Sequence, residues 1–262
     1  ISGQAASGWM IQNGEPDGAP MRGNPGLSDF TTGYTAVIGT LMAYMSAQKT
    51  GRGQVVDVSM FESQALFIQD YVTAWVDAGV MKPRSGSRQF NFQPYDVFPA
   101  KDGKYVAIGG FGPAVFERIV QALELDPTYY TRDTCGNGVE AVSSPKGREF
   151  DAFVRNWVAE RNAKDVVDHM DRYRVAAQIV VDAQDIVTDP HWIGRGDILK
   201  YEDQTLGRDI TSVGIIPKLS ETPGQIWRGA PRLGQDTDLV LKALCGYTEE
   251  DLATLRAENL IQ

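Results

Sequence analysis

The segment from Gly26 to Gly33 (GLSDFTTG) constrains the fold of this chain most strongly, because it opens a long apolar helix. Pro25 and Gly26 interrupt the chain just before it, and Ser28 or Asp29 is a natural N-cap. Behind the N-cap, apolar side chains recur at helical spacing: Phe30, Tyr34, Val37, Ile38, Leu41, Met42 and Met45. The pattern therefore predicts a strongly apolar helix with a carboxylate at its N-terminus.

Asp29 allows two interpretations on this local pattern. The helix dipole and the free backbone N–H groups of a first turn favour the charged form of a carboxylate. A charged, positioned carboxylate can attack an activated acyl group. The plainer interpretation is that Asp29 only caps the helix, as most capping Asp residues do. The segments further along the chain favour the first interpretation.

Length and composition indicate an ordinary soluble globular protein, with 262 residues of which 42% are hydrophobic and 23% charged. The net charge of −9 argues against nucleic acids and anionic membrane surfaces as partners. No apolar run has the length of a membrane-spanning helix. Two distant cysteines form no disulfide framework, which predicts a reducing, cytoplasmic location. Two histidines outside any ligand cluster predict no metal site.

Residues 1–85 are predicted to be helical with one strand. Val55–Met60 alternates and is rich in valine, as a strand should be. Residues 61–80 predict a second long helix, whose candidate core residues are Leu66, Tyr71, Trp75 and Val76. The breaker-rich, basic stretch at 81–94 is predicted to be a linker between domains.

The rest of the chain predicts an α+β region. Asp102-Gly103 is a strong hairpin turn between strands at 95–99 and 104–109, and Leu206-Gly207 is a turn within strands at 198–219. Helices are expected at 114–125, 146–161 and 163–173, a short strand at 178–181, and a last helix after the Thr248 capping box.

Two glycine-rich segments carry weaker signals. Gly109–Pro113 (GGFGP) invites a dinucleotide-loop interpretation, but Pro113 removes a backbone donor and Val115 stands where a third glycine is required. A strand-to-helix turn is therefore predicted. Pro223–Pro231 is either a structured surface loop or the lining of a cleft or subunit contact, and its local sequence does not decide between them.

Three segments together resemble the family III coenzyme A transferases, the CaiB/BaiF family. The first is Ser28–Gly33, where the family has its catalytic Asp. The second is Lys49–Glu62 (KTGRGQVVDVSMFE), close to the family's TGxGQxVDVSxxE signature. The third runs from Leu233 to Asp251 and is similar to the family's LGxxTxxVL…GYSxxxI pattern. The match is specific and spans most of the chain.

The resemblance implies an α/β fold, with a large Rossmann-like domain and a small α+β domain, in an interlocked homodimer. Residues 1–85 would belong to the large domain, 86–205 would form the small domain, and 206–262 would return to the large one. The family's N-terminal Rossmann-like segment, which supplies most CoA contacts, has no counterpart here. Met60 is the candidate residue for the CoA pocket, and a role in the core is the equally weighted alternative.

The resemblance also implies CoA transfer between an acyl-CoA and a small carboxylic acid. Asp29 would attack the thioester and form a mixed anhydride, and the released CoA thiolate would then convert it to an aspartyl-CoA thioester. The acceptor acid would reverse these steps. Coenzyme A enters as a thioester substrate, and no permanently bound cofactor is implied.

Two further segments resemble the carnitine CoA-transferase branch, namely Ser7–Gly14 (SGWMIQNG) and Pro223–Pro231 (PGQIWRGAP). That branch implies crotonobetainyl-CoA or γ-butyrobetainyl-CoA with carnitine. A quaternary ammonium group needs aromatic faces or carboxylates around it. The aromatic candidates, each of which also suits a packing role, are Tyr34, Trp75, Tyr95 and Trp227.

Two alternatives stay open. One is an α-methylacyl-CoA racemase of the same family, which pairs the equivalent Asp with a His. Racemases tend to carry a Glu where this chain has Gly109–Gly112. The other alternative is a non-catalytic fragment or assembly subunit.

Overall fold

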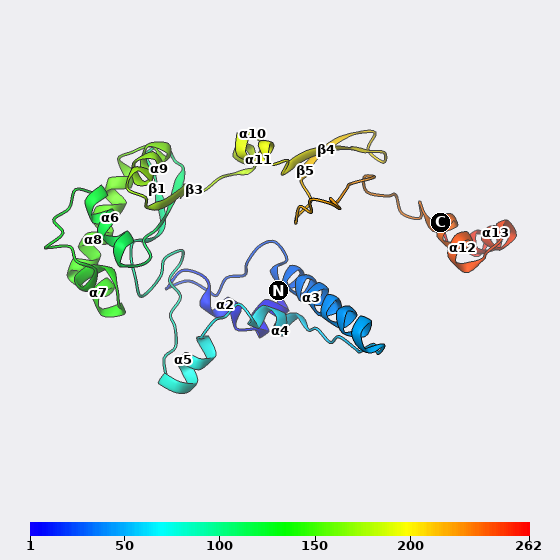
Figure 1. The fold of residues 1–262 in the computed structure, drawn as a ribbon, viewed down its shortest axis with the longest axis horizontal. Helices are drawn as coiled ribbons and strands as arrows, with labels where there is room; N and C mark the ends of the chain where they lie inside the picture. The colour runs from blue at the N-terminus through cyan, green and yellow to red at the C-terminus, as the bar shows by residue number, and fades with distance from the viewer. The chain divides into compact units, whose positions relative to one another are not determined.

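The computed structural model of the chain describes all 262 residues. They form two compact units, Ile1–Val180 and Val181–Gln262 (Figure 1). The first unit contains the elements from α1 to β3, and the second contains α10 to α13 with β4 and β5. None of the helices combines the length and the apolar composition that crossing a lipid bilayer requires.

Helix α3 (Leu27–Thr50) dominates the N-terminal part of the first unit and confirms the predicted long apolar helix. It ends at Gly51, whose left-handed conformation (φ 70°) lets its N–H donate to the Ala47 carbonyl at 2.8 Å. Its N-cap is Gly26, so the prediction that Ser28 or Asp29 is the N-cap is wrong. The helix begins earlier, and Asp29 lies inside its first turn.

Four short helices accompany α3, and α1 and α4 pack against it. They are α1 (Ser2–Ala6), α2 (Trp9–Gln12), α4 (Met60–Ala65) and α5 (Tyr71–Ala78). The predicted helix at 61–80 is therefore broken between α4 and α5, where Gln69 takes a left-handed conformation (φ 54°). Its candidate core residues are not in the core, since Leu66, Trp75 and Val76 are exposed and Tyr71 is half-buried.

The predicted strand at 55–60 is wrong. Residues 52–59 have no regular secondary structure, and Val55 is 93% exposed. A strand must pair its backbone N–H and C=O groups with a neighbour, and no strand of the chain pairs with this segment. The alternating pattern indicates only a preference for extended backbone, and no neighbouring strand is present to pair with it.

The second part of the first unit is built on an antiparallel sheet of order β1-β2-β3. The strands are β1 (Tyr95–Pro99), β2 (Tyr105–Gly109) and β3 (Ala176–Ile179). Phe98 pairs with Val106, which pairs in turn with Ile179. The hairpin turn at Asp102-Gly103 and the strand-to-helix turn after Gly109 are confirmed.

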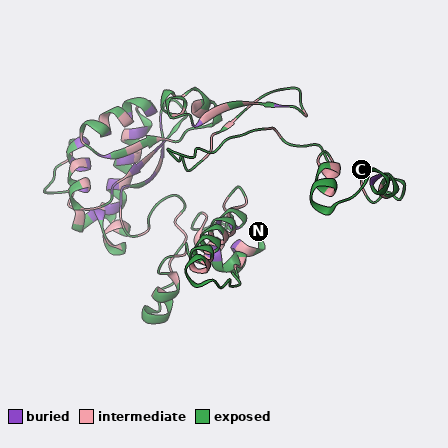
Figure 2. Ribbon diagram, turned by 45° about the vertical axis from the view of Figure 1, so that its right-hand side comes forward, coloured by how far each residue is buried: buried purple, intermediate pink, exposed green.

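Helices cover one face of this sheet, and a hydrophobic core fills the space between them. They are α6 (Pro113–Ala122), α8 (Pro145–Ala159) and α9 (Ala163–Arg172). The short helix α7 (Val139–Ser143) and a π-helical turn at Arg132–Gly136 pack against α8. The Phe98 side chain points from β1 into this core. In the core, the centroids of the Phe116 and Phe150 rings lie 5.3 Å apart. Burying each such side chain contributes about 1.5–3 kcal/mol. Figure 2 shows the buried residues gathered in this part of the chain.

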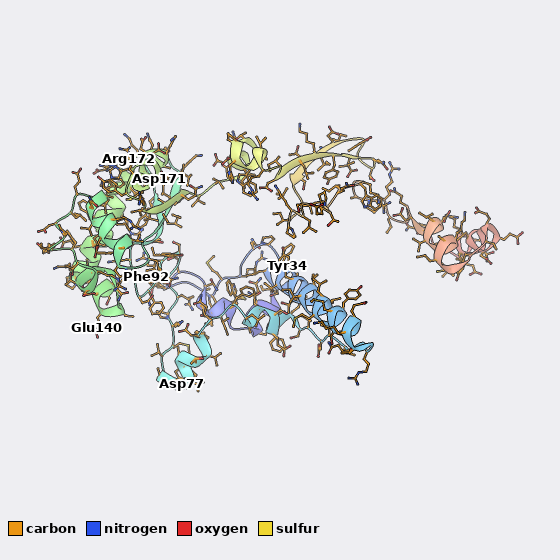
Figure 3. The ribbon with its side chains drawn as sticks, viewed as in Figure 1. Tyr34, Asp77, Phe92, Glu140, Asp171 and Arg172 are labelled. Carbon is orange, nitrogen blue, oxygen red and sulfur yellow. The ribbon has the colours of Figure 1, made fainter.

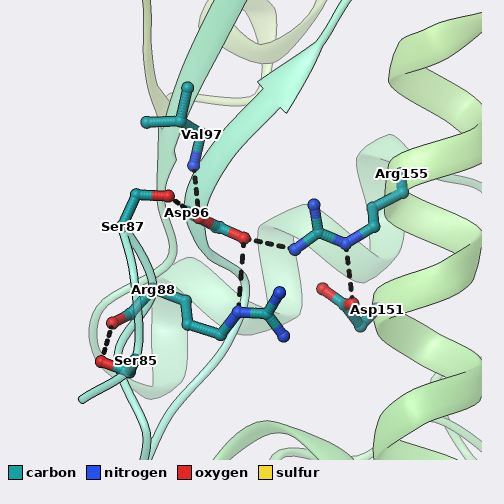
Figure 4. Close-up of polar contacts among 7 residues, drawn as sticks. All are labelled: Ser85, Ser87, Arg88, Asp96, Val97, Asp151 and Arg155. Atoms are coloured by element: carbon teal, nitrogen blue, oxygen red, sulfur yellow. Dashed lines mark hydrogen bonds and ion pairs between the residues drawn. The ribbon is translucent and has the colours of Figure 1, made fainter. Parts of the chain in front are cut away.

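The segment before β1, predicted to be a linker, is tied to this sheet at Asp96 (Figure 4). The buried Asp96 carboxylate accepts hydrogen bonds from Ser87 and Arg155, and the Arg88 guanidinium lies 3.8 Å away. Burial alone would raise the pKa of Asp96, but the bonds from Ser87 and Arg155 outweigh it and lower that pKa. The carboxylate therefore stays charged and anchors the end of the linker.

The second unit holds a β-hairpin and four helices. The hairpin pairs β4 (Ile198–Asp203) with β5 (Arg208–Val213), as predicted. The helices are α10 (Ala183–Thr188), α11 (Pro190–Gly194), α12 (Thr237–Cys245) and α13 (Glu249–Ala257). Thr248 and Asp251 form the predicted capping box of α13. The predicted domain boundaries at 85/86 and 205/206 stay a prediction.

Candidate active site

Asp29 lies in the first turn of α3 with its side chain exposed. Its N–H donates to the Gly26 carbonyl at 2.9 Å, and the same carbonyl accepts from the Phe30 N–H at 3.2 Å. The carboxylate itself has no hydrogen bond or ion pair. An accessible carboxylate held on a fixed backbone is the arrangement that a nucleophile requires.

A buried polar cluster lies beneath this turn. The Ser28 hydroxyl donates to Gln64 Oε1 at 3.2 Å, and Gln64, on α4, is completely buried. The Thr31 and Thr32 hydroxyls donate to the Ser28 carbonyl at 3.1 and 2.6 Å. The cluster therefore fixes Ser28, the residue immediately before Asp29.

A second pair of bonds fixes the start of the same loop. Gln4, on α1, is buried, and its Oε1 accepts from the Gly23 N–H at 2.8 Å. Its Nε2 donates to the Gly23 carbonyl at 3.2 Å. Sequence reasoning missed Gln4 and Gln64, because only the packing of α1 and α4 on α3 gives them this role. A glutamine in a short helix carries no such signal by itself.

Met60 is the first residue of α4 and not, as predicted, the last residue of a strand. It lies close to Ser28, since a Cβ built on Gly3 would be 3.3 Å from the Met60 Cβ and 3.1 Å from the Ser28 Oγ. Met60 is thus near the turn that carries Asp29, and its side chain is partly exposed. Its contribution to a CoA pocket stays a prediction.

Within the first unit, no ring contact joins the three aromatic candidates Tyr34, Trp75 and Tyr95. Tyr34 shares α3 with Asp29, is 70% exposed and projects outward (Figure 3). Trp75 lies on α5, and Tyr95 packs edge-on against Phe92 at 5.2 Å between ring centroids. Trp227 is 77% exposed in the second unit.

The Pro223–Pro231 segment is a structured loop. The Arg228 guanidinium donates two hydrogen bonds to the Asp236 carboxylate, at 2.8 and 2.5 Å. These bonds lower the pKa of Asp236. The same guanidinium lies 4.5 Å from the centre of the Trp227 ring, so one face of this indole already meets a cation. The Arg228–Asp236 pair therefore braces the loop next to Trp227, whose side chain stays exposed.

A polar pocket of about 320 Å³ lies in the first unit beside the linker, with Gln12, Asn13, Lys82 and Arg88 among its lining residues. Both cations already have carboxylate partners, Asp70 for Lys82 and Asp96 for Arg88. The pocket is therefore a poor match for the phosphates of a nucleotide. No group of three or more His, Cys, Asp or Glu side chains could hold a metal ion.

Comparisons with known proteins relate the chain to one family. The family described as CoA-transferase family III matches residues 1–237. The succinyl-CoA–D-citramalate CoA-transferase of Chloroflexus aurantiacus is 31% identical over 99% of this chain and 63% of its own length. The L-carnitine CoA-transferase of a Proteus species is 27% identical over 98% of this chain and 63% of its own length.

The fold of the chain agrees with a solved structure. The crystal structure of a CaiB/BaiF family protein from Brucella suis matches with a TM-score of 0.71 at 20% identity. The match covers 91% of this chain and 60% of that one. The chain thus spans under two thirds of the length of these relatives.

Proposed function

The chain belongs to CoA-transferase family III, and from this membership we propose that the protein transfers CoA from an acyl-CoA to a carboxylic acid with Asp29 as its nucleophile. The observation that carries the proposal is the geometry of Asp29. Its carboxylate is exposed and unpaired, and the backbone that bears it is held by the buried cluster around Gln64. This turn lies within the segment that resembles the family's catalytic motif.

The proposed reaction proceeds in covalent steps. A carboxylate oxygen of Asp29 attacks the thioester carbonyl, the C–S bond breaks, and CoA leaves as a thiolate from a mixed anhydride. The thiolate attacks the aspartyl carbonyl and releases the first carboxylic acid, which leaves an aspartyl-CoA thioester. The acceptor carboxylate then reverses both steps. An anhydride keeps the acyl group activated, so water must be excluded during turnover.

Trapping tests the role of Asp29 directly. Full-length protein incubated with acyl-CoA and hydroxylamine should carry a hydroxamate on Asp29, detected by mass spectrometry of the peptide. Asp29→Ala should lose transfer and labelling while staying folded, because losing an exposed carboxylate from the first turn of a helix costs only about 0.3–1 kcal/mol. Asp77→Ala, on the exposed face of α5 (Figure 3), is the matched control and should keep both. Near-normal turnover in Asp29→Ala would refute the assignment.

The same trapping experiment separates the alternatives. A racemase of this family would exchange the α-proton of its substrate without forming an aspartyl adduct, and a non-catalytic subunit would do neither. We also propose an interlocked homodimer, supported by the exposed apolar side chains of α3. A cytoplasmic location and the lack of a permanently bound cofactor are parts of the same proposal.

A carnitine-type trimethylammonium acid is the proposed substrate. The Ser7–Gly14 and Pro223–Pro231 motifs support it, and so does the similarity to a Proteus L-carnitine CoA-transferase. The second candidate is succinyl-CoA with a small hydroxy acid, which the 31% identity to the D-citramalate transferase supports. A cationic acyl group and an anionic one need opposite charges around them, so one active site cannot favour both.

A competition assay decides between these substrates. It compares γ-butyrobetainyl-CoA plus carnitine with succinyl-CoA plus citramalate and with formyl-CoA plus oxalate. We expect the first pair to have the highest kcat/KM. A tenfold preference for another pair, about 1.4 kcal/mol in transition-state binding, would remove the carnitine assignment and leave CoA transfer standing.

A further inference from the structure

Gly26 leaves open the space into which the Asp29 carboxylate folds. A Cβ built on Gly26 would lie 2.8 Å from Asp29 Oδ2, 3.6 Å from its Cγ and 3.7 Å from its Cβ. These are the three nearest heavy atoms, so the carboxylate is what a side chain at position 26 would meet first. Such a short contact requires one of the two groups to move.

The backbone around this contact is held on several sides. The Gly26 carbonyl accepts hydrogen bonds from the N–H groups of Asp29 and Phe30, which begin α3. Ser28 is bonded to the buried Gln64. On the other side, α1 comes so close that a Cβ on Gly3 would be 3.1 Å from the Ser28 Oγ. The mobile partner in the contact is therefore the end of the Asp29 side chain.

We propose that Gly26 is a positioning residue for CoA transfer, because its missing side chain sets where the Asp29 carboxylate lies. The inference rests on the proposed role of Asp29 as the nucleophile. A methyl group at position 26 would turn the carboxylate away and leave the helix in place. Misplacing a reacting group by about 1 Å lowers a rate by about 100-fold.

The test compares Gly26→Ala with Gly194→Ala in the full-length protein. Gly194 lies in α11, where an added Cβ meets no heavy atom within 4 Å, so it controls for the same chemical change. Crystal structures of wild type and Gly26→Ala should show the Asp29 carboxylate rotated away from residue 26. Turnover of Gly26→Ala should fall by about 100-fold, with the KM for acyl-CoA and the Tm close to wild type. Gly194→Ala should match wild type in all four measurements.

Two results would overturn the inference: an Asp29 carboxylate that keeps its place in Gly26→Ala, or a wild-type turnover in that variant. A wild type that transfers no CoA would refute the proposed function alone, and the two crystal structures would still decide on Gly26. If Gly26→Ala does not fold, the double variant with Asp29→Ala replaces it, because it removes the clashing carboxylate. Recovery of folding in the double variant supports the inference, and failure of both variants to fold refutes it.

Discussion

The two parts of the first unit differ in whether they bury hydrophobic side chains. Every buried hydrophobic side chain of the chain except Leu252 lies between Phe98 and Val175, in the sheet region. Residues 1–79, the N-terminal helical region, contain none of them. The buried residues of the helical region are all polar: Gln4, Ser7, Ser28, Thr31, Ser63 and Gln64. Figure 2 shows the contrast, with the buried residues gathered in the sheet region and α3 largely a mixture of exposed and half-buried residues.

This difference separates two sources of order. The sheet region has a hydrophobic core, which is the dominant favourable contribution to folding. The helical region is held around Asp29 by hydrogen bonds, each worth about 1 kcal/mol net. The apolar side chains of α3 face outward, and a continuous apolar surface of this kind is typical of an interface. We therefore expect the helical region, and the proposed active site with it, to depend on contacts that cover α3.

The largest expected effect concerns residues 1–262 expressed alone. Because the apolar face of α3 is uncovered, this chain should self-associate and unfold in a concentration-dependent way. Replacing Ile38, Leu41 and Met42 by serine should shift it toward monomer, as measured by light scattering and sedimentation. If the unmodified chain is a monomer and melts sharply at a temperature independent of its concentration, the helical region does not depend on contacts that cover α3.

A matched pair of substitutions measures the same contrast residue by residue. Ile119 is completely buried in the sheet region, whereas Ile38 is 59% exposed on α3. Ile119→Ala should lower the free energy of unfolding by about 2–5 kcal/mol, because it leaves a cavity in the core. Ile38→Ala should change it by less than about 0.5 kcal/mol in a monomeric background. Denaturant unfolding followed by circular dichroism measures both, and equal losses at the two positions would contradict the contrast.

The sheet region was the more predictable of the two from sequence. Asp102-Gly103 fixes a two-strand hairpin locally, and the helices at 113–122, 145–159 and 163–172 carry apolar stripes that pack within the same region. The predictions of a strand at 55–60 and of one helix at 61–80 are wrong, because a segment adopts its preferred secondary structure only where another element packs against it. Which elements pack against these two segments cannot be read from their own sequence.

The candidate site was predictable only at its centre. The motif around Asp29 identified the carboxylate, and the structure keeps it accessible at the start of α3. Gly26, Gln4 and Gln64 act through contacts between segments far apart in sequence. Their residue types are ordinary for turns and short helices, so a single sequence carries no signal for them.

Asp96 offers a test of the one buried charge that joins the linker to the sheet region. Asp96→Asn should cost about 2 kcal/mol at neutral pH, because Arg155 and Ser87 lose a charged acceptor. The pKa of Asp96 is lowered in the folded protein, so the charged form stabilises the fold above the ordinary value of 3.8. This stabilisation is lost as the pH falls through the lowered pKa.

The difference between wild type and Asp96→Asn should therefore shrink as the pH drops below about 3.8. This difference is followed by measuring the free energy of unfolding of both proteins from pH 7 to pH 2.5. Asp70→Asn is the control, because its ion pair with Lys82 is exposed and should contribute little at any pH. A pH-independent difference would show that Asp96 acts through packing and not through its charge.

The smallest expected effect separates two buried glutamines, one in each region. Gln93 Nε2 donates to the carbonyls of Cys135 and Gly147 at 2.6 and 2.8 Å, whereas the buried Gln64 Nε2 has no partner. Gln93→Met should cost about 2 kcal/mol, since two buried carbonyls lose their donor. Gln64→Met loses the bond from Ser28 but also removes an unpaired buried amide, so the two contributions offset to within about 0.5 kcal/mol.

Urea unfolding of residues 1–262 compares the stability losses of the two variants, and an equal loss at both positions would show that Gln64 is a stabilising core residue. If Gln64→Met leaves the free energy of unfolding almost unchanged, Gln64 orders the turn before Asp29 while adding little to stability. That is the behaviour expected of a residue that serves the active site.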